Sequence, residues 1–179
     1  VDFQSYCLKY KKANIVQFDS VIGKIHDNKA ILTITIPKIG FQFGRLIDKS
    51  SPKSVDKQIN KLKRKLGNDL FKHIFQVNLC DNGVEFSTFY NIEIDHETKE
   101  TLCKSFYTRP YKSSDKPECE NLHRLVRYCF PKGKSHNNLT QDMLDEAFSN
   151  INSYIRKELN NKSPYDLARR LYGVEFLDK

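Results

Sequence analysis

The chain has 179 residues, enough for one domain with a substantial hydrophobic core and too few to argue comfortably for two. Thirty Lys and Arg residues against 22 Asp and Glu give a formal charge of +8, which favours a polyanionic partner such as nucleic acid, although a solvated basic surface would carry the same charge. No apolar run approaches the roughly 18 residues of a membrane helix, and the five cysteines form no C-x-x-C pair, so neither a membrane span, a disulfide framework nor a zinc site is indicated.

The start of the chain carries no signal-peptide pattern, so we expect a cytoplasmic protein without a membrane partner. The first residue is Val1 and not an initiator Met, and strand-like sequence follows soon after it. We therefore expect residues 1–179 to be a single-domain fragment of a longer protein.

Three β-rich stretches joined by short turns come first, at 15–23, 29–37 and 41–47. The second alternates with period two from Ile31 to Ile36 and stops at Pro37. Consecutive strands with short connections predict an antiparallel meander. The first stretch carries Asp19 among apolar residues, where a buried carboxylate is costly unless it is compensated. Asp19 is therefore either a surface residue on a polar strand face or the first functional acid.

A helix is predicted to start at Ser51 and Pro52 and to end at Gly67. One of its faces is apolar at helical spacing and should pack on the sheet: Val55, Ile59, Leu62 and Leu66. The opposite face carries a basic row that can follow a phosphate backbone, but such a row is more often a solvated helix face: Lys53, Lys57, Lys61, Lys63, Arg64 and Lys65. Because this helix separates the meander from the next strand, it implies a crossover, parallel pairing and a mixed sheet.

The next apolar stretch, 75–80, ends abruptly in Asp81-Asn82-Gly83. This pattern predicts a buried strand that delivers a carboxylate to its C-terminal end, where ligands collect in sheets covered by helices. Asn82 and Gly83 would supply a sharp turn because both tolerate positive φ, and a hairpin of the Asn-Gly type is the alternative. Glu85 is interpreted as a structural or substrate-orienting residue and not as a further ligand.

The polar segment 88–101 shows no periodicity. Asp95, His96 and Glu97 cluster in it, yet no partner at ligand spacing accompanies them, so an exposed loop is favoured over a metal site. A short strand is predicted from Lys104 to Arg109.

A capping box at 115–118, with Asp115 as N-cap, predicts the start of the next helix. Glu118 and Glu120 are about 200° apart around a helix, and Glu118 is engaged by the cap, so Glu120 is the acid that can face a site. Arg127 lies two turns further on nearly the same face, where it can contact a phosphate. Arg124 is a further phosphate contact, whereas His123 is interpreted as a surface histidine.

Two more helices close the chain. The first is predicted from the N-cap Thr140 to about Leu159, with an apolar stripe that should cover the sheet: Leu144, Phe148, Ile151, Ile155 and Leu159. The second starts at Ser163 and stops at Gly173.

Two aspartates at strand ends and one glutamate on a later helix suit hard divalent cations, which prefer oxygen ligands. Two such ions about 4 Å apart can activate an attacking oxygen and stabilise a leaving one during in-line displacement at phosphorus. The acids therefore predict phosphoryl-transfer chemistry on nucleic acid.

Five motifs also carry a family resemblance: F-D-S-V-I-G-K (18–24), C-D-N-G-V-E-F (80–86), F-Y-T-R-P-Y (106–111), E-N-L-H-R-L-V-R-Y-C-F-P-K-G (120–133) and N-K-S-P-Y (161–165). Together they resemble the catalytic core of DDE transposases and integrases, and within that group the insertion-sequence transposases of the "thirty" branch. The resemblance covers nearly the whole chain.

The resemblance implies a ribonuclease H-like fold of class α/β, with a mixed five-stranded sheet, an antiparallel meander plus parallel strands, flanked by helices. It places Asp19, Asp81 and Glu120 at the catalytic and metal-binding positions, with 61 and 38 residues between them. It also implies that these three acids bind two Mg²⁺ or Mn²⁺ ions. It also implies DNA contacts from Arg127, Arg124, Lys116 and Lys132, and supporting roles for Asn82, Gly83 and Asn121.

The implied activity is nicking of transposon ends and joining of the 3′-hydroxyl to target DNA, by a homo-oligomer assembled on DNA in a bacterial cytoplasm, at the nucleoid. Two departures stand out. The family's Ser-Trp-Gln-Lys-Gly is replaced by Ser-Ser-Asp-Lys-Pro at 113–117, and its N-terminal helix-turn-helix region is absent from these residues. A ribonuclease H-like nuclease without strand transfer, and an inactive remnant or repurposed DNA-binding module, are the alternatives.

Overall fold

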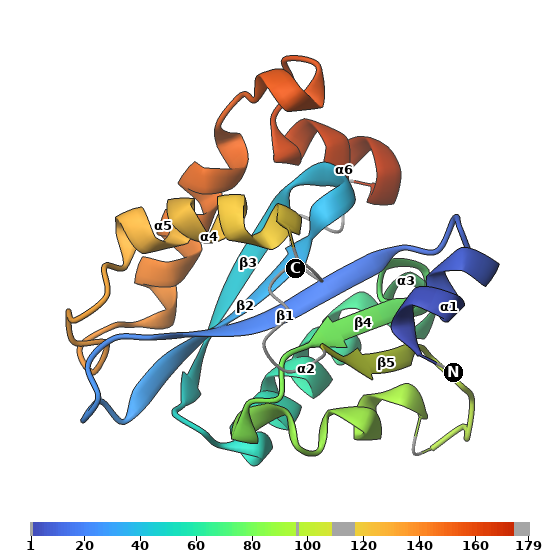
Figure 1. Ribbon diagram of the computed structural model, residues 1–179, viewed down its shortest axis with the longest axis horizontal. Coiled ribbons are helices and arrows are strands. Elements are labelled where there is room, and N and C mark those ends of the chain that lie inside the picture. The colour runs from blue at the N-terminus through green and yellow to red at the C-terminus, as the bar shows by residue number, and fades with distance from the viewer. Residues whose placement is uncertain (1, 96, 109–116, 174–179) are drawn as a thin grey trace.

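A computed structural model describes residues 2–95, 97–108 and 117–173, and for 117–121 it describes the helix without the side chains. The strands are β1 (Ile15–Ile22), β2 (Lys29–Ile36), β3 (Phe41–Asp48), β4 (Val77–Cys80) and β5 (Lys104–Tyr107) (Figure 1). The helices are α1 (Phe3–Lys9), α2 (Pro52–Leu66), α3 (Asn68–Ile74), α4 (Pro117–Cys129), α5 (Gln141–Ser153) and α6 (Pro164–Tyr172). Short 3-10 turns include η1 (Pro37–Ile39), η2 (Val84–Phe86), η3 (Phe89–Glu93) and η5 (Lys157–Leu159).

The sheet has five strands in the order β3-β2-β1-β4-β5. β1 pairs antiparallel with β2, and β2 with β3, as the predicted meander requires. β4 pairs parallel with β1 on one side and with β5 on the other. The predicted mixed sheet and the crossover through α2 are therefore confirmed.

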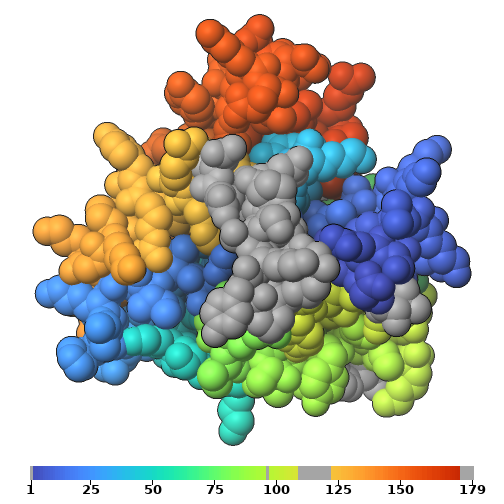
Figure 2. Space-filling model, in the orientation of Figure 1, coloured from blue at the N-terminus to red at the C-terminus, as the bar shows by residue number. Residues whose placement is uncertain are grey.

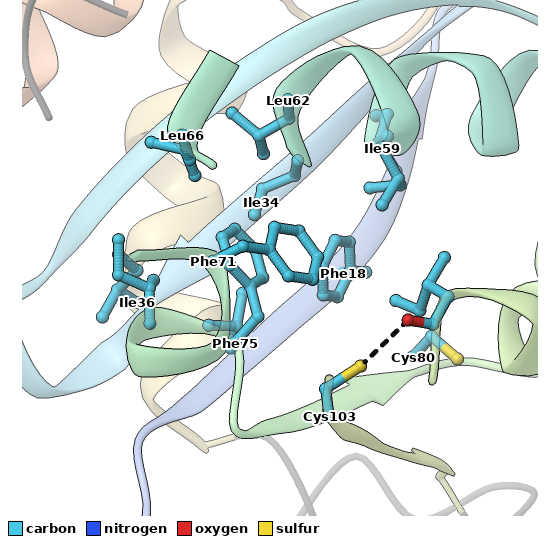
Figure 3. Close-up of a cluster of buried hydrophobic side chains, with 14 of the residues drawn as sticks. Phe18, Ile34, Ile36, Ile59, Leu62, Leu66, Phe71, Phe75, Cys80 and Cys103 are labelled. Atoms are coloured by element: carbon cyan, nitrogen blue, oxygen red, sulfur yellow. Dashed lines mark hydrogen bonds between the residues drawn. The ribbon is translucent and has the colours of Figure 1, made fainter. Parts of the chain in front are cut away.

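Helices cover both faces of the sheet (Figure 1). On one face, Phe18 of β1 packs with Phe71 and Phe75 of the α3 region, together with the apolar stripe of α2 (Figure 3). On the other face, Val21 of β1 packs with Val126 of α4 and with residues of α5. β2 is consequently buried on both sides, including Thr33 and Thr35, which the alternation alone would have placed on a solvated face.

Helix α2 forms as its sequence predicted. The Ser51 side chain accepts a hydrogen bond from the N–H of Ser54, Pro52 occupies the first turn, and Gly67 ends the helix. The four stripe residues are buried against the sheet: Val55, Ile59, Leu62 and Leu66. Full burial of one such side chain contributes about 1.5–3 kcal/mol to stability.

Three features of the helices differ from the predictions. α1 and α3 were not predicted, because each has only 7 residues and too few turns to show a periodic stripe. α3 runs to Ile74, so β4 begins at Val77 and not at residue 75. α5 ends at Ser153, six residues before the predicted Leu159.

Arg156 explains the early end of α5. Its guanidinium is buried and donates hydrogen bonds to the carbonyls of Gly40 and Ile151. A continued helix would bury Ile155 in the stripe, but this side chain is 62% exposed. Buried polar groups require partners, so the two carbonyls fix Arg156 inward and turn Ile155 outward.

The segment 88–101 is also more ordered than predicted. Asp95 is buried and accepts hydrogen bonds from the N–H groups of Glu97 and Thr98 and from the ammonium of Lys63, at 2.9 Å in each case. The N–H of Thr98 and the charge of Lys63 hold the pKa of Asp95 well below its usual range. Lys63 therefore joins α2 to this segment and is not part of a purely solvated row.

No helix in the described part of the chain is long and apolar enough to cross a membrane.

Sheet and helix pack closely at Gly44 of β3 and Phe148 of α5. A Cβ atom at Gly44 would lie 2.2 Å from Cε2 of Phe148, so the helix can approach the strand only because this position has no side chain.

We expect Gly44→Ala to lower the free energy of unfolding by about 1–3 kcal/mol through overpacking, measured by urea denaturation. Glu146→Ala, at an exposed position of α5, is the matched control and should change stability little. Equal stabilities for the two variants would contradict this packing.

Candidate active site

Parallel pairing of β1 with β4 determines where the first two acids lie. The pairing ends at Phe18 opposite Cys80. Asp19 and Asp81 therefore directly follow the last paired residues of two neighbouring strands. Neighbouring strands are about 4.8 Å apart, which places the two aspartates side by side. Phe18 and Cys80 belong to the core under α2 and α3, and Asp19 therefore points to the opposite face, which α4 covers.

The carboxylate of Asp19 is half-buried and contacts α4. Its Oδ2 lies 3.6 Å from Nε2 of His123, and its Oδ1 accepts a hydrogen bond from the N–H of Ser20 at 2.7 Å. Nε2 of His123 is also 3.5 Å from the hydroxyl of Thr33, which donates to the Asp19 carbonyl. The surface interpretation of His123 was wrong: it is half-buried and adjoins the first acid. Its spacing of three residues from Glu120, on the same helical face, was the available signal.

The turn after β4 holds Asp81 in a different way from the predicted one. Oδ1 of Asp81 accepts a hydrogen bond from the N–H of Gly83 at 2.9 Å. Gly83 has φ −59°, and Asn82 is not among the described residues with positive φ, so the turn does not depend on that backbone region. Gly83 leaves space for two acidic side chains, because a Cβ there would lie 2.9 Å from Asp81 Oδ1 and from Glu85 Cδ and would displace them. Asn82 instead donates to the carbonyl of Thr108 at 2.7 Å, which joins the turn to the chain after β5.

The third acid lies on α4, in the first turn of the helix. Glu120 comes one turn before His123, and residues three apart share a helical face. The side chains of Glu120 and Asn121 lie outside the described residues, as do Asp115 of the predicted capping box and Lys116. Among the residues that are described, no three His, Cys, Asp or Glu side chains lie close enough to hold a metal ion.

The basic residues of this region divide into two kinds. Arg127 is half-buried and donates from Nη1 to the carbonyl of Ile22 at 2.8 Å, so it anchors α4 to the end of β1. Arg124 and Lys132 are exposed, one on α4 and one in the loop after it. The structure thus assigns Arg127 a structural contact in addition to its predicted role.

Two of the sequence motifs meet beside this site. Asp27, in the turn after β1, accepts hydrogen bonds from the Ser135 hydroxyl at 2.6 Å and from the N–H of His136 at 2.8 Å. Gly23 packs against the same segment so closely that a Cβ would lie 2.3 Å from the carbonyl oxygen of Lys134. The blue turn after β1 and the orange segment after α4 accordingly adjoin on the surface (Figure 2). Asp27 was not predicted from the sequence, because its partners Ser135 and His136 are more than 100 residues away along the chain.

Asp27 should make part of the stability acid-dependent. The Ser135 hydroxyl and then the His136 N–H lower the pKa of Asp27 to about 2, whereas an unfolded Asp has a pKa of about 3.9. A depressed pKa in the folded state stabilises the fold above the unfolded pKa, and this contribution is lost as pH falls through about 2. Asp27→Asn should therefore weaken the decline in stability between pH 5 and pH 2, measured by urea unfolding. Asp142→Asn, at an exposed site, should keep the wild-type decline, and the same decline in Asp27→Asn would contradict the assignment.

The fold defines the class. The five-stranded mixed sheet with its flanking helices is the ribonuclease H-like fold of integrase catalytic cores. The catalytic core domain of BIV integrase superposes with a TM-score of 0.54 at 17% identity, over 87% of this chain and 93% of that one. A chain of the simian T-cell lymphotropic virus intasome, in complex with PP2A regulatory subunit B56 gamma, gives 0.61 at 14% identity, over 86% and 53%.

Sequence relatives point to the same group. The transposase for insertion sequence element IS4351 of Bacteroides fragilis is 28% identical over 156 residues, 87% of this chain and 44% of that protein. A putative integrase, ORF3, of Spiroplasma virus SpV1-R8A2 B is 26% identical over 163 residues, 89% of this chain and 48% of that protein. No family model matches the chain. The predicted resemblance to transposases and integrases is confirmed, and the chain spans about half the length of these curated relatives.

Proposed function

We propose that this chain is the catalytic core of a DDE-type transposase, a metal-dependent polynucleotidyl transferase that nicks the ends of a mobile element and joins the 3′-hydroxyl to target DNA. One observation carries the proposal: Asp19 and Asp81 are neighbours at the end of the β1–β4 pairing, beside the helix that carries Glu120. The transposase and integrase relatives support this chemistry over other reactions of the same fold.

The two aspartates fit a divalent cation. Both are carboxylates, which hard ions such as Mg²⁺ and Mn²⁺ prefer as ligands. They follow the ends of two adjacent strands, where their like charges repel each other. A cation between them offsets that repulsion. Asp19, Asp81 and Glu120 are the residues that would hold two ions. When bound, these ions supply activation of the attacking oxygen and stabilisation of the leaving oxygen at phosphorus.

The surrounding residues orient the acids. The N–H groups of Ser20 and Gly83 each donate a hydrogen bond to one oxygen of Asp19 and Asp81, respectively, which orients the two carboxylates. Arg127 holds α4 against the end of β1, and the helix position in turn places Glu120. The exposed side chains of Arg124 and Lys132, on α4 and in the loop after it, would neutralise phosphates of bound DNA.

Replacing the second acid tests the chemistry. Asp81→Asn keeps the shape of the side chain and removes its charge, so Mg²⁺-dependent nicking and joining of end-sequence DNA should fall by about 10³-fold or more. The unfolding midpoint should change little. Asp69→Asn, an exposed acid in the first turn of α3, is the charge-matched control and should retain activity.

The outcomes separate the alternatives. Nicking at the wild-type rate in Asp81→Asn would refute the assignment of this acid. Nicking without joining of pre-cut ends by the wild-type chain would identify a nuclease of the same fold. Absence of both reactions, with DNA binding intact, would identify an inactive remnant or a DNA-binding module.

Salt dependence tests the DNA surface. Lys132→Gln and Arg124→Gln each remove one proposed phosphate contact, so each should reduce the slope of log K against log salt concentration by about 0.9. Lys53→Gln removes an equal charge from exposed α2, on the other side of the sheet, and should leave the slope unchanged. Binding should be measured by fluorescence anisotropy with duplexes of unrelated sequence. Equal slopes for all three variants and the wild type would contradict this surface.

A further inference from the structure

Glu85 is a buried carboxylate next to the proposed active site that the mechanism above does not use. It lies in η2, the short turn after Asp81, and is 7% exposed although its neighbour Val84 is 65% exposed. Its Oε1 accepts a short hydrogen bond from the hydroxyl of Ser20, the residue that directly follows Asp19. Burying a carboxylate is costly unless the charge is compensated, so its position requires an explanation.

The strand pairing explains why a link at this point matters. β4 stops pairing with β1 at Cys80, while β1 continues to Ile22 paired with β2 alone. Backbone hydrogen bonds of the sheet therefore do not fix the turn that carries Asp81 relative to the strand that carries Asp19. The Ser20–Glu85 hydrogen bond spans this gap on the β1 side.

Two further hydrogen bonds of the turn lead to the β5 side. Asn82 donates to the carbonyl of Thr108, and the Tyr107 hydroxyl donates to the carbonyl of Phe86 at 2.7 Å, both at the β5 side. Glu85 itself returns towards Asp81: a Cβ at Gly83 would lie 2.9 Å both from Asp81 Oδ1 and from Glu85 Oε2. Glu85 thus contacts the strand of the first acid and lies next to the second.

We propose that Ser20 and Glu85 form a positioning pair that sets the separation of the Asp19 and Asp81 carboxylates and so tunes their affinity for a divalent cation. This inference rests on the proposed function. In this proposal Glu85 acts through Ser20 and not as a ligand, because its Oε1 is engaged by the Ser20 hydroxyl. Outer residues of this kind typically change metal affinity by 10–100-fold when they are replaced.

Mn²⁺ binding to the whole chain, followed by electron paramagnetic resonance, tests the pair without an activity assay. Ser20→Ala and Glu85→Gln should each raise the Mn²⁺ dissociation constant about 10-fold or more. The double variant should bind no more weakly than the weaker single variant, because both substitutions act on the same hydrogen bond: Ser20→Ala removes its donor, and Glu85→Gln replaces its charged acceptor with a weaker neutral one. Ser20→Thr keeps a hydroxyl and should bind as the wild type. Glu100→Gln, an exposed acid paired with Lys72 near the opposite end of β5, controls for the loss of charge.

The results distinguish failure of this inference from failure of the proposed function. Equal Mn²⁺ affinity of the wild type and Asp81→Asn would overturn the proposed site itself. Tight binding by the wild type that Ser20→Ala and Glu85→Gln do not weaken would overturn the positioning pair alone. Weakening by Glu85→Gln but not by Ser20→Ala would make Glu85 a direct ligand and would also overturn it, as would additive losses in the double variant. Thermal unfolding of each variant shows that the fold is retained, and Glu85→Gln carries the test if Ser20→Ala unfolds, because unchanged Mn²⁺ affinity in that variant overturns the positioning pair.

Discussion

The parallel register of β1 and β4 is the constraint on which the rest of this structure depends. It pairs Phe18 with Cys80, both in the core beneath α2 and α3, and so leaves Asp19 and Asp81 as neighbours where the pairing stops. A slip of one residue would move each side chain of the strand to the other face, taking Phe18 out of the core and Asp19 into it. Burial of the aromatic cluster therefore enforces the same register that brings the acids together (Figure 3).

Contacts of the helices that cover the sheet determine the position of α4, which the strand pairing alone does not. Helix α4 is held at its C-terminal half by Val126 in the core, by Arg127 on the carbonyl of Ile22, and by the loop that Asp27 binds. These contacts orient the helix whose first turn carries Glu120. The motif around Asp19 and the motif that ends α4 therefore pack together, because Gly23 contacts the segment that follows α4. The hydrogen bond from Ser20 to Glu85 likewise connects the turn after β4 to β1.

Long, patterned segments were predictable from the sequence. The apolar stripe of α2, its Ser51 cap and the crossover it implies followed from spacing alone, because an amphipathic helix must bury one face. Elements with little local signal were missed: α1 and α3 are 7 residues long, and each is stabilised by contacts with distant segments. The end of α5 was misplaced because Ile155 fits the stripe, whereas the carbonyls that bind Arg156 decide which residue turns inward.

The sequence by itself determined the kind of sheet and the faces of its main helices, because residue type and local spacing within single segments carry both. Together with the family resemblance, it also predicted Asp19, Asp81 and Glu120 as the acids of one site. Only the tertiary structure placed His123 beside Asp19, paired Lys63 with Asp95, and buried Glu85 against Ser20. These contacts join residues 32 to 104 positions apart, and whether a polar side chain is solvated or buried depends on what packs on it from elsewhere in the chain.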